Sequence, residues 1–380
     1  MSLSILFLTG SRGEWGYIRP ILKKCPEYNI KYHICATNMH LIPRFGFSVQ
    51  EICKDGFEVE DEILMAFEGY DHFAMTKSLG VCLLSLVDVL RRLKPDWIML
   101  AGDRGEQLMG AIAGAYTYTP VAHIQAGELS GNIDGMARHA IGKLVHLHFA
   151  SNEDAAQRLI RLGEESFRVH VVGAPQLDEL VEGQYSSIQE LKDKYAIPVD
   201  EPFLLIVQHA VTEEFDKAEE QIKATIEAVD QFDLVKIWIL PNNDAGSEIV
   251  RESIIKNRKG KIFIFKNMPR EDYLGLLASC KAIVGNSSSG LLEAPTFSTP
   301  AVNIGRRQLN RVRGKNVIDV DEFEVEKIIK AINKAISSEF RASLEGMINP
   351  YGDGKSAERI LNIITNTPID SRLLIKRLTY

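Results

Sequence analysis

Polar residues follow four of the short apolar segments of this chain, at the positions where a buried strand would end. In an open parallel sheet such positions meet at one edge, which is where ligands bind. Carboxylate, amide and imidazole groups at that edge can exchange protons, and a turn rich in glycine and serine can bind phosphate. We therefore predict an active site there, built from Asp103, Gln125, Glu128, His209 and the run 285–290.

The run 285–290 reads GNSSSG and lies where a strand should lead into a helix. Small residues let backbone N–H groups approach phosphate oxygens, serine hydroxyls add donors, and a helix dipole favours negative charge. A helix N-cap needs only one serine. The turn therefore predicts a diphosphate site at Ser287 and Ser288. Glu293, one turn later, could accept from sugar hydroxyls, or it could simply pair with the helix dipole.

Other charged residues occupy loops with the same relation to predicted strands. Arg12, in the first strand–helix turn, suits an anion, although the turn lacks the GxGxxG spacing of dinucleotide sites and could be only a tight turn. Asp103 and Asp134 could act as general acid and base, or as helix N-caps. Arg307 could belong to a charged clamp or to a solvated basic loop.

Short apolar segments alternate with helical patterns along the whole chain, which predicts an α/β fold with parallel sheets. The pattern loosens over 183–202, where we place a linker containing a polar helix. We predict two doubly wound, Rossmann-like domains with a cleft between them. The expected boundaries are 1–182, 183–356, and a C-terminal helical segment, 357–380, that is split at Pro368 and crosses back to the first domain.

Composition excludes several classes of protein. The chain has 380 residues, a net charge of −7 and 45% hydrophobic residues, which is typical of a globular protein and argues against a broad nucleic-acid surface. We find no apolar run of about 18–20 residues and no signal peptide, and so expect no membrane partner. Five unclustered cysteines predict a reducing, cytoplasmic setting. No cofactor and no metal site are expected, because the histidines show no ligand spacing.

Eight ordered motifs resemble those of the hydrolysing UDP-N-acetylglucosamine 2-epimerases, of the bacterial sialic-acid-pathway type and of the epimerase half of the animal bifunctional enzyme. The resemblance covers nearly the whole chain and implies the two-domain GT-B fold. The motifs are TGSRGEWG at 9–16, AGDR at 101–104, HIQAGELSGNID at 123–134, RHAIGKLVHLHF at 138–149, QHAVTEE at 208–214, PNNDAGS at 241–247, GNSSSG at 285–290 and GRRQLNRVRG at 305–314.

The resemblance implies a two-step reaction on a UDP-sugar. A base removes the proton on C2 while UDP leaves C1, giving a 2-acetamidoglycal. Water then adds with inversion at C2 and releases the free manno sugar. By the same resemblance, the catalytic residues are Asp103, Asp134, His209 and Gln125, and the residues that bind UDP or the sugar are Arg12, Glu14, Arg104, Asn242, Asp244, Ser287, Ser288, Glu293 and Arg307.

The chain departs from the family pattern at several positions. Gln125 stands where the animal-type enzymes carry a catalytic glutamate, and a glutamine cannot exchange a proton near pH 7. This substitution moves the expected proton transfers to Asp103 and Asp134, with His209 as a further candidate. Ala101 replaces a histidine or another small residue, and Ala210 replaces a proline.

These departures leave the sugar open. UDP-GlcNAc is one candidate substrate, within sialic-acid synthesis. UDP-2,4-diacetamido-2,4,6-trideoxyglucose, on the route to legionaminic acid, is the other, because Gln125 and Ala101 would suit a less hydroxylated sugar. A non-hydrolysing 2-epimerase and a non-catalytic UDP-sugar-binding protein are the remaining alternatives. Family members often form homo-oligomers, so a dimer or tetramer is expected.

Overall fold

The computed structural model describes residues 2–43, 46–67, 72–129, 133–241, 246–257, 260–377 and 379. It divides into two compact units. Unit 1 comprises Met1–Asp178 together with Tyr351–Tyr380, and unit 2 comprises Glu179–Pro350. Each unit contains one parallel sheet with helices packed on it, so the predicted pair of doubly wound α/β domains is confirmed.

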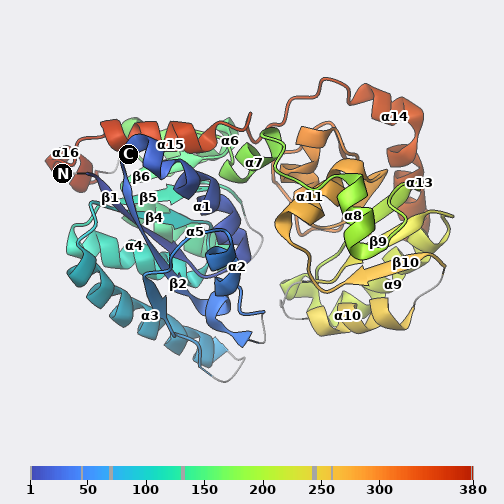
Figure 1. Ribbon diagram of the computed structural model, residues 1–380, viewed down its shortest axis with the longest axis horizontal. Helices are drawn as coiled ribbons and strands as arrows, with labels where there is room; N and C mark the ends of the chain where they lie inside the picture. The colour runs from blue at the N-terminus through green and yellow to red at the C-terminus, as the bar shows by residue number, and fades with distance from the viewer. Residues whose placement is uncertain are drawn as a thin grey trace. The chain divides into compact units, whose positions relative to one another are not determined.

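The sheet of unit 1 has seven parallel strands in the order β3-β2-β1-β4-β5-β6-β7 (Figure 1). The central strands are buried along their whole length, and for this reason they lack the polar–apolar alternation of a half-exposed strand. The strands are β1 (Ser4–Thr9), β2 (Lys31–Thr37), β3 (Asp61–Ile63), β4 (Trp97–Ala101), β5 (Val121–Ile124), β6 (Leu147–Ala150) and β7 (Val169–Val171).

Helices connect these strands and cover the sheet of unit 1. One of them, α3, is long and apolar enough to cross a bilayer by length and composition, which the count of consecutive apolar residues did not indicate. It packs against α4, and Cys82, Leu86 and Leu90 on it lie in the hydrophobic core. The helices are α1 (Arg12–Lys24), α2 (Val49–Lys54), α3 (His72–Leu93), α4 (Gly105–Thr117), α5 (Ile133–Leu144) and α6 (Glu153–Arg161). The short helix α7 (Asp178–Val181) follows, and the division between the two units falls after its first residue.

The sheet of unit 2 has six parallel strands in the order β10-β9-β8-β11-β12-β13. They are β8 (Phe203–Val207), β9 (Val235–Ile239), β10 (Ile262–Phe265), β11 (Ala282–Gly285), β12 (Ala301–Ile304) and β13 (Val317–Val320). The polar helix predicted within 183–202 is confirmed as α8 (Ile188–Tyr195), which a Ser187–Glu190 capping box begins; it lies within unit 2 and contacts α11. The other helices are α9 (Ala218–Asp230), α10 (Ser247–Lys256), α11 (Arg270–Ser279), α12 (Ser289–Leu292), α13 (Val325–Ile336) and α14 (Ser338–Ser343).

The last residues of the chain pack on unit 1 as α15 (Ser356–Asn366) and α16 (Ser371–Leu374), with α15 beside α1 (Figure 1). A fully buried arginine, Arg168, holds α16 in place. Its guanidinium donates to the carbonyls of Leu373 at 2.7 Å, Arg372 at 2.8 Å and Ile375 at 3.2 Å. These carbonyls at the end of α16 would otherwise be unsatisfied, because the helix has no following turn.

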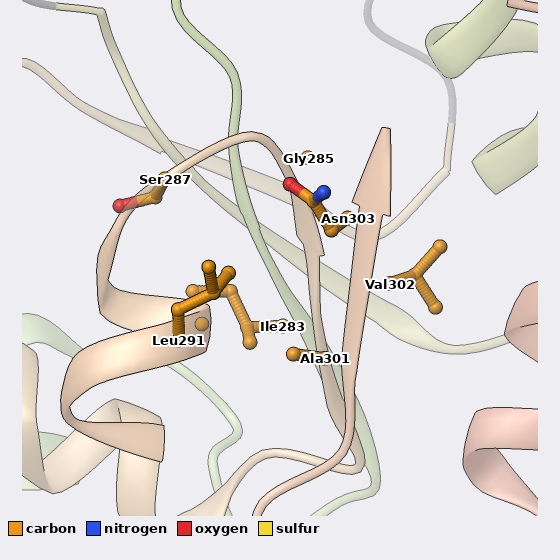
Figure 2. Close-up of a pocket in the computed structure, with 8 residues that line it drawn as sticks. Ile283, Gly285, Ser287, Leu291, Ala301, Val302 and Asn303 are labelled. Atoms are coloured by element: carbon orange, nitrogen blue, oxygen red, sulfur yellow. The ribbon is translucent and has the colours of Figure 1, made fainter. Parts of the chain in front are cut away.

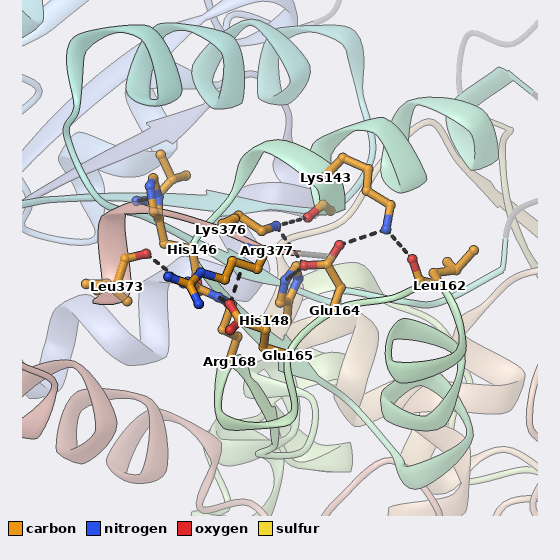
Figure 3. Close-up of polar contacts among 12 residues, drawn as sticks. Lys143, His146, His148, Leu162, Glu164, Glu165, Arg168, Leu373, Lys376 and Arg377 are labelled. Atoms are coloured by element: carbon orange, nitrogen blue, oxygen red, sulfur yellow. Dashed lines mark hydrogen bonds and ion pairs between the residues drawn. The ribbon is translucent and has the colours of Figure 1, made fainter. Parts of the chain in front are cut away.

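A second polar group fixes the segment after α16 (Figure 3). Two groups contact the same carboxylate oxygen, Glu164 Oε2. Lys376 Nζ lies 2.7 Å from it, and His148 Nε2 lies 3.1 Å from it. Burial lowers the pKa of Lys376 to about 8, and burial lowers the pKa of His148 to about 4, although Glu164 acts in the opposite direction in each case. The terminal residues are therefore tied to β6 by buried polar contacts as well as by apolar packing.

Four buried histidines of unit 1 have strongly lowered pKa values. Burial is the largest cause for each, and it lowers the pKa of His40, His146 and His148 to about 4 and that of His123 to about 3. In the unfolded chain these groups would titrate near 6.5. Between pH 6.5 and 4 these four groups therefore bind more protons in the unfolded state than in the folded state, and their contribution to the free energy of unfolding falls as pH falls through this window.

We predict that unit 1 loses stability first on acidification, since the four shifted histidines all lie in it. A shift of two pKa units corresponds to roughly 2–3 kcal/mol for one group. Urea unfolding at pH 7.5, 6 and 5 can be followed by tryptophan fluorescence. A Trp238→Phe variant reports on unit 1, and a Trp15→Phe/Trp97→Phe variant reports on unit 2. Equal loss of stability in the two units would contradict the prediction.

Candidate active site

The strand order of each unit reverses at one point, and the predicted site residues follow the strands that flank it. In unit 1 the reversal lies between β1 and β4, and in unit 2 between β8 and β11. Connections on either side of such a point run to opposite faces of the sheet and leave an opening for a ligand. Arg12 and Asp103 follow the first pair of strands, whereas His209 and the 285–290 turn follow the second pair.

The first turn of α1, which follows β1 directly, carries a buried carboxyl group. Ser11 is the N-cap of α1, and its hydroxyl accepts from the N–H of Glu14 at 3.4 Å. Glu14 is 2% exposed, and its Oε2 accepts from the N–H of Gly10 at 2.5 Å. Arg12 pairs with Glu51 at 3.1 Å, so its charge is already partly neutralised within unit 1.

The pKa of Glu14 is raised well above its ordinary value. Burial is the largest cause, and the neighbouring carboxylate of Glu106 adds to it, whereas Arg104 and the N–H of Gly10 act in the opposite direction. Arg104 Nε lies 3.3 Å from Glu106 Oε1. The residues that follow β1 and β4 therefore meet in one group of charges, in which burial and Glu106 oppose ionisation of Glu14.

Asp103 follows the end of β4 and pairs with a buried arginine. Arg138 donates through Nη2 to Asp103 Oδ2 and through Nη1 to the carbonyl oxygen of Gln125 at 2.7 Å. The side chain of Arg138 is 2% exposed and that of Asp103 is 18% exposed. Burial opposes the charge of Arg138, but Asp103 and Glu128 raise its pKa. The fixed positive charge stabilises the carboxylate form of Asp103.

Gln125 follows β5 in the left-handed conformation, with φ of 59°. This conformation is uncommon for a residue with a side chain and costs of order 1 kcal/mol. The hydrogen bond from Arg138 to the Gln125 carbonyl offsets this cost. The left-handed conformation turns the chain sharply at the end of β5. Gln125 is 5% exposed, and its backbone carbonyl shares the Arg138 guanidinium with Asp103.

Residues of the loop after β5 are held by helix α6 and by α5. Glu128 is 5% exposed and accepts from Asn152 at 2.8 Å, and Gly127 approaches Ala155 so closely that a side chain would not fit. Asp134 lies in the first turn of α5, one helical turn before Arg138, and so on the same side of the helix. Arg138 therefore joins Asp103 to the carbonyl of Gln125, and Asp134 lies one helical turn from this arginine.

The turn at 285–290 of unit 2 begins with a glycine that no other residue could replace. Gly285 has φ of +128°, and a Cβ there would lie 2.2 Å from the carbonyl oxygen of Val207. Figure 2 shows the turn beside the ends of β11 and β12, with a small pocket lined in part by Ser287 and Asn303. Ser287 Oγ accepts from the N–H of Ser289 at 3.3 Å, and Ser288 makes no side-chain cap.

The helix expected after this turn is short, and this corrects one argument made from the sequence. α12 contains only Ser289–Leu292, so a macrodipole contributes little to anion binding. Backbone N–H groups and hydroxyls remain as the donors. Glu293 lies just beyond α12 rather than on its exposed face. It is 7% exposed and pairs with Arg270 at 3.5 Å, so the alternative that Glu293 simply pairs with a helix dipole is wrong.

Asn286 joins the remaining predicted residues of unit 2. Its side-chain Oδ1 accepts from the N–H of His209 at 2.7 Å, and its Nδ2 donates to the carbonyl of His209 at 2.9 Å. Its own carbonyl accepts from Arg307 at 3.3 Å and from Gln308 at 2.9 Å. His209, the serine turn and Arg307 are thereby brought together.

Two of the predicted binding residues, Asn242 and Asp244, lie outside the described residues. Within the part of the chain that the structure describes, no group of three His, Cys, Asp or Glu side chains could hold a metal ion. Sequence reasoning did not select Arg138 or Glu106, and it included Asn286 only as a member of the run 285–290, without a role of its own. The only signal in the sequence for these residues was a charged or amide side chain at a position expected to be buried. Their hydrogen-bond partners could not be recognised, because they lie far away in the sequence.

Comparison with known proteins identifies the family. The family model of UDP-N-acetylglucosamine 2-epimerase matches residues 23–365. The chain is 36% identical to the UDP-N,N'-diacetylbacillosamine 2-epimerase (hydrolyzing) of Legionella pneumophila, covering 99% of each chain. It is 32% identical to the UDP-N-acetylglucosamine 2-epimerase of Neisseria meningitidis serogroup B, covering 95% of each chain.

The fold is also shared with solved structures. The crystal structure of UDP-GlcNAc 2-epimerase from Neisseria meningitidis bound to UDP-GlcNAc superposes with a TM-score of 0.84 at 19% identity, covering 96% of this chain and 100% of that chain. The two-sheet α/β architecture is thus of the GT-B type, as expected. The extent of the family match and the identity to full-length relatives show that this chain belongs to the UDP-N-acetylglucosamine 2-epimerase family.

Proposed function

We propose that this protein is a hydrolysing UDP-sugar 2-epimerase that converts a UDP-activated 2-acetamido sugar and water into the free 2-epimer and UDP. Family membership supports the proposal, and two relatives at 36% and 31% identity are named as hydrolysing enzymes. The observation within the structure that carries it is the Asp103–Arg138 pair at the switch point of unit 1. It provides a partly exposed carboxylate whose charged form is stabilised by a buried cation.

The first step is an elimination. Asp103 is the proposed base that takes the C2 proton, and the C2–H electron pair forms the C1=C2 double bond as the C1–O bond to UDP breaks. The departing diphosphate gains negative charge, which the hydroxyls of Ser287 and Ser288 and the guanidinium of Arg307 would stabilise. Gln125 can orient the sugar by hydrogen bonding but cannot take part in the proton transfer.

The second step is a hydration of the glycal. The oxygen of water adds to C1 as one of its protons passes to a basic group, and the C1=C2 electron pair takes a proton at C2 from the face opposite to that of its removal. Asp134, one turn before Arg138 on α5, is the proposed second proton-transfer group, with His209 as a further candidate. No oxidant or reductant is required, because an elimination followed by a hydration involves no net change in oxidation state.

Two sugars are compatible with this mechanism. The relatives named for UDP-N-acetylglucosamine support UDP-GlcNAc. The second candidate is UDP-2,4-diacetamido-2,4,6-trideoxyglucose, which is UDP-N,N'-diacetylbacillosamine. A specific observation favours it, namely the higher identity to the Legionella pneumophila enzyme over nearly the whole of both chains. The buried Ala101 and Gln125 are consistent with a sugar that carries fewer hydroxyl groups.

Product analysis by NMR in D2O tests the reaction, with UDP-GlcNAc and UDP-N,N'-diacetylbacillosamine in parallel tubes. We expect UDP and a free manno sugar that carries one deuteron at C2. The UDP-sugar that is converted faster is identified as the substrate. Full retention of hydrogen at C2 would exclude the elimination, and a stable UDP-linked epimer would indicate a non-hydrolysing enzyme. UDP binding without turnover in either tube would indicate a binding protein instead.

Asp103→Asn should lower kcat by roughly 100-fold or more, the range attributed to a general base, while UDP still binds. The amide keeps the size of the side chain and can accept from Arg138, so folding should be preserved. Steady-state kinetics with calorimetric UDP titration separate the two effects. Near-normal kcat would remove Asp103 from the catalytic role.

The double variant Ser287→Ala/Ser288→Ala should weaken UDP binding by roughly 1–3 kcal/mol, because hydrogen bonds to a charged group would be lost. Ser298→Ala is a suitable control, since Ser298 lies in the same unit and donates to the carbonyl of Leu344 rather than to the turn. Isothermal titration with UDP measures the difference. An unchanged Kd in the double variant would refute the phosphate site.

A further inference from the structure

The side chain of Asn286 is hydrogen-bonded to the backbone of a residue far away in the sequence. Its amide forms two hydrogen bonds with His209, one accepted from the N–H at 2.7 Å and one donated to the carbonyl at 2.9 Å. The two residues are 77 positions apart in the sequence. A side-chain amide that satisfies both backbone groups of one residue fixes that residue in position and orientation, as a neighbouring strand would.

The backbone of Asn286 is occupied as well. Its N–H donates to the carbonyl of Val207 at 3.1 Å, and its carbonyl accepts from Arg307 and Gln308. Asn286 is 1% exposed. Because its backbone groups and both ends of its side-chain amide already have partners within unit 2, it is not placed to contact a ligand itself.

We infer that Asn286 is a positioning residue that holds His209 in register with the diphosphate-binding turn. Ser287 and Ser288 follow it directly, so one residue connects the proposed donors for the leaving group to the imidazole-bearing segment after β8. Gly285 lets the turn approach Val207 closely enough for these bonds to form. This inference rests on the proposed function for the role of His209. The pair of hydrogen bonds between Asn286 and His209, here called the brace, is a structural feature that does not depend on that function.

An aspartate at position 286 provides a test with almost no change in size. Asn286→Asp keeps the acceptor for the His209 N–H but replaces the donor with an oxygen that faces the His209 carbonyl. The backbone bond to Val207 does not depend on the side chain, so the serine turn should stay in place. We expect kcat to fall at least tenfold and the Kd for UDP to change less than threefold.

A double-mutant cycle distinguishes positioning of His209 from a general loss of structure. If Asn286 acts through His209, then Asn286→Asp should cost less than twofold in kcat when it is added to His209→Ala, because the group that it positions is already absent. Equal fold losses in the two backgrounds would overturn the inference. Asn349→Asp is the matched control, since Asn349 is a buried asparagine of the same unit whose amide donates to the Leu292 carbonyl at 2.8 Å. It should lower the melting temperature without the same loss of kcat.

Hydrogen exchange tests the brace independently of activity. The backbone N–H of His209 should exchange slowly in the wild-type protein, and it should exchange at least tenfold faster in Asn286→Ala, which removes the acceptor. Unchanged exchange would overturn the inference. If the wild-type protein turned over neither sugar, the proposed function would fail, and the exchange of His209 would then decide on the brace alone.

Discussion

Every strand in both sheets runs parallel to its neighbours, and this constraint determines where chemistry can occur. Parallel strands place all their carboxyl ends at one edge, so the residues that follow them share a neighbourhood regardless of their separation in sequence. Glu14, Asp103 and Gln125 follow three adjacent strands of unit 1, and His209 and Asn286 follow two adjacent strands of unit 2. The active-site hypothesis depends first on this topology and only then on the residue types.

Each group of site residues is organised around one buried polar side chain. Arg138 joins Asp103 to the carbonyl of Gln125, and Asn286 joins His209 to the serine turn. Burying a guanidinium or an amide is unfavourable unless its hydrogen bonds are made, so each of these residues is stable only when its partners are in place. The same condition makes them effective at fixing geometry, because the alternative positions leave polar groups unsatisfied.

The substitution of Gln125 for a glutamate is compatible with the geometry of unit 1. Its backbone is held in the left-handed conformation by Arg138, and this hydrogen bond uses the main-chain carbonyl and not the side chain. A change from carboxylate to amide at that side chain therefore leaves the turn intact. It also leaves Asp103 as the carboxylate that the buried cation stabilises.

The sequence by itself determined the α/β class, the two sheets, the polar helix over 188–195 and the split C-terminal helices, because hydrophobic periodicity and capping residues are local properties. It also located the turns that carry Asp103 and Ser287, because polar residues at strand ends are visible in the chain. Only the tertiary structure showed the partners of Arg138 and Asn286, the short length of α12, and the pairing of Glu293 with Arg270. These features depend on contacts between residues far apart in sequence, whose free energies of desolvation and hydrogen bonding exist only after the strands have been brought together.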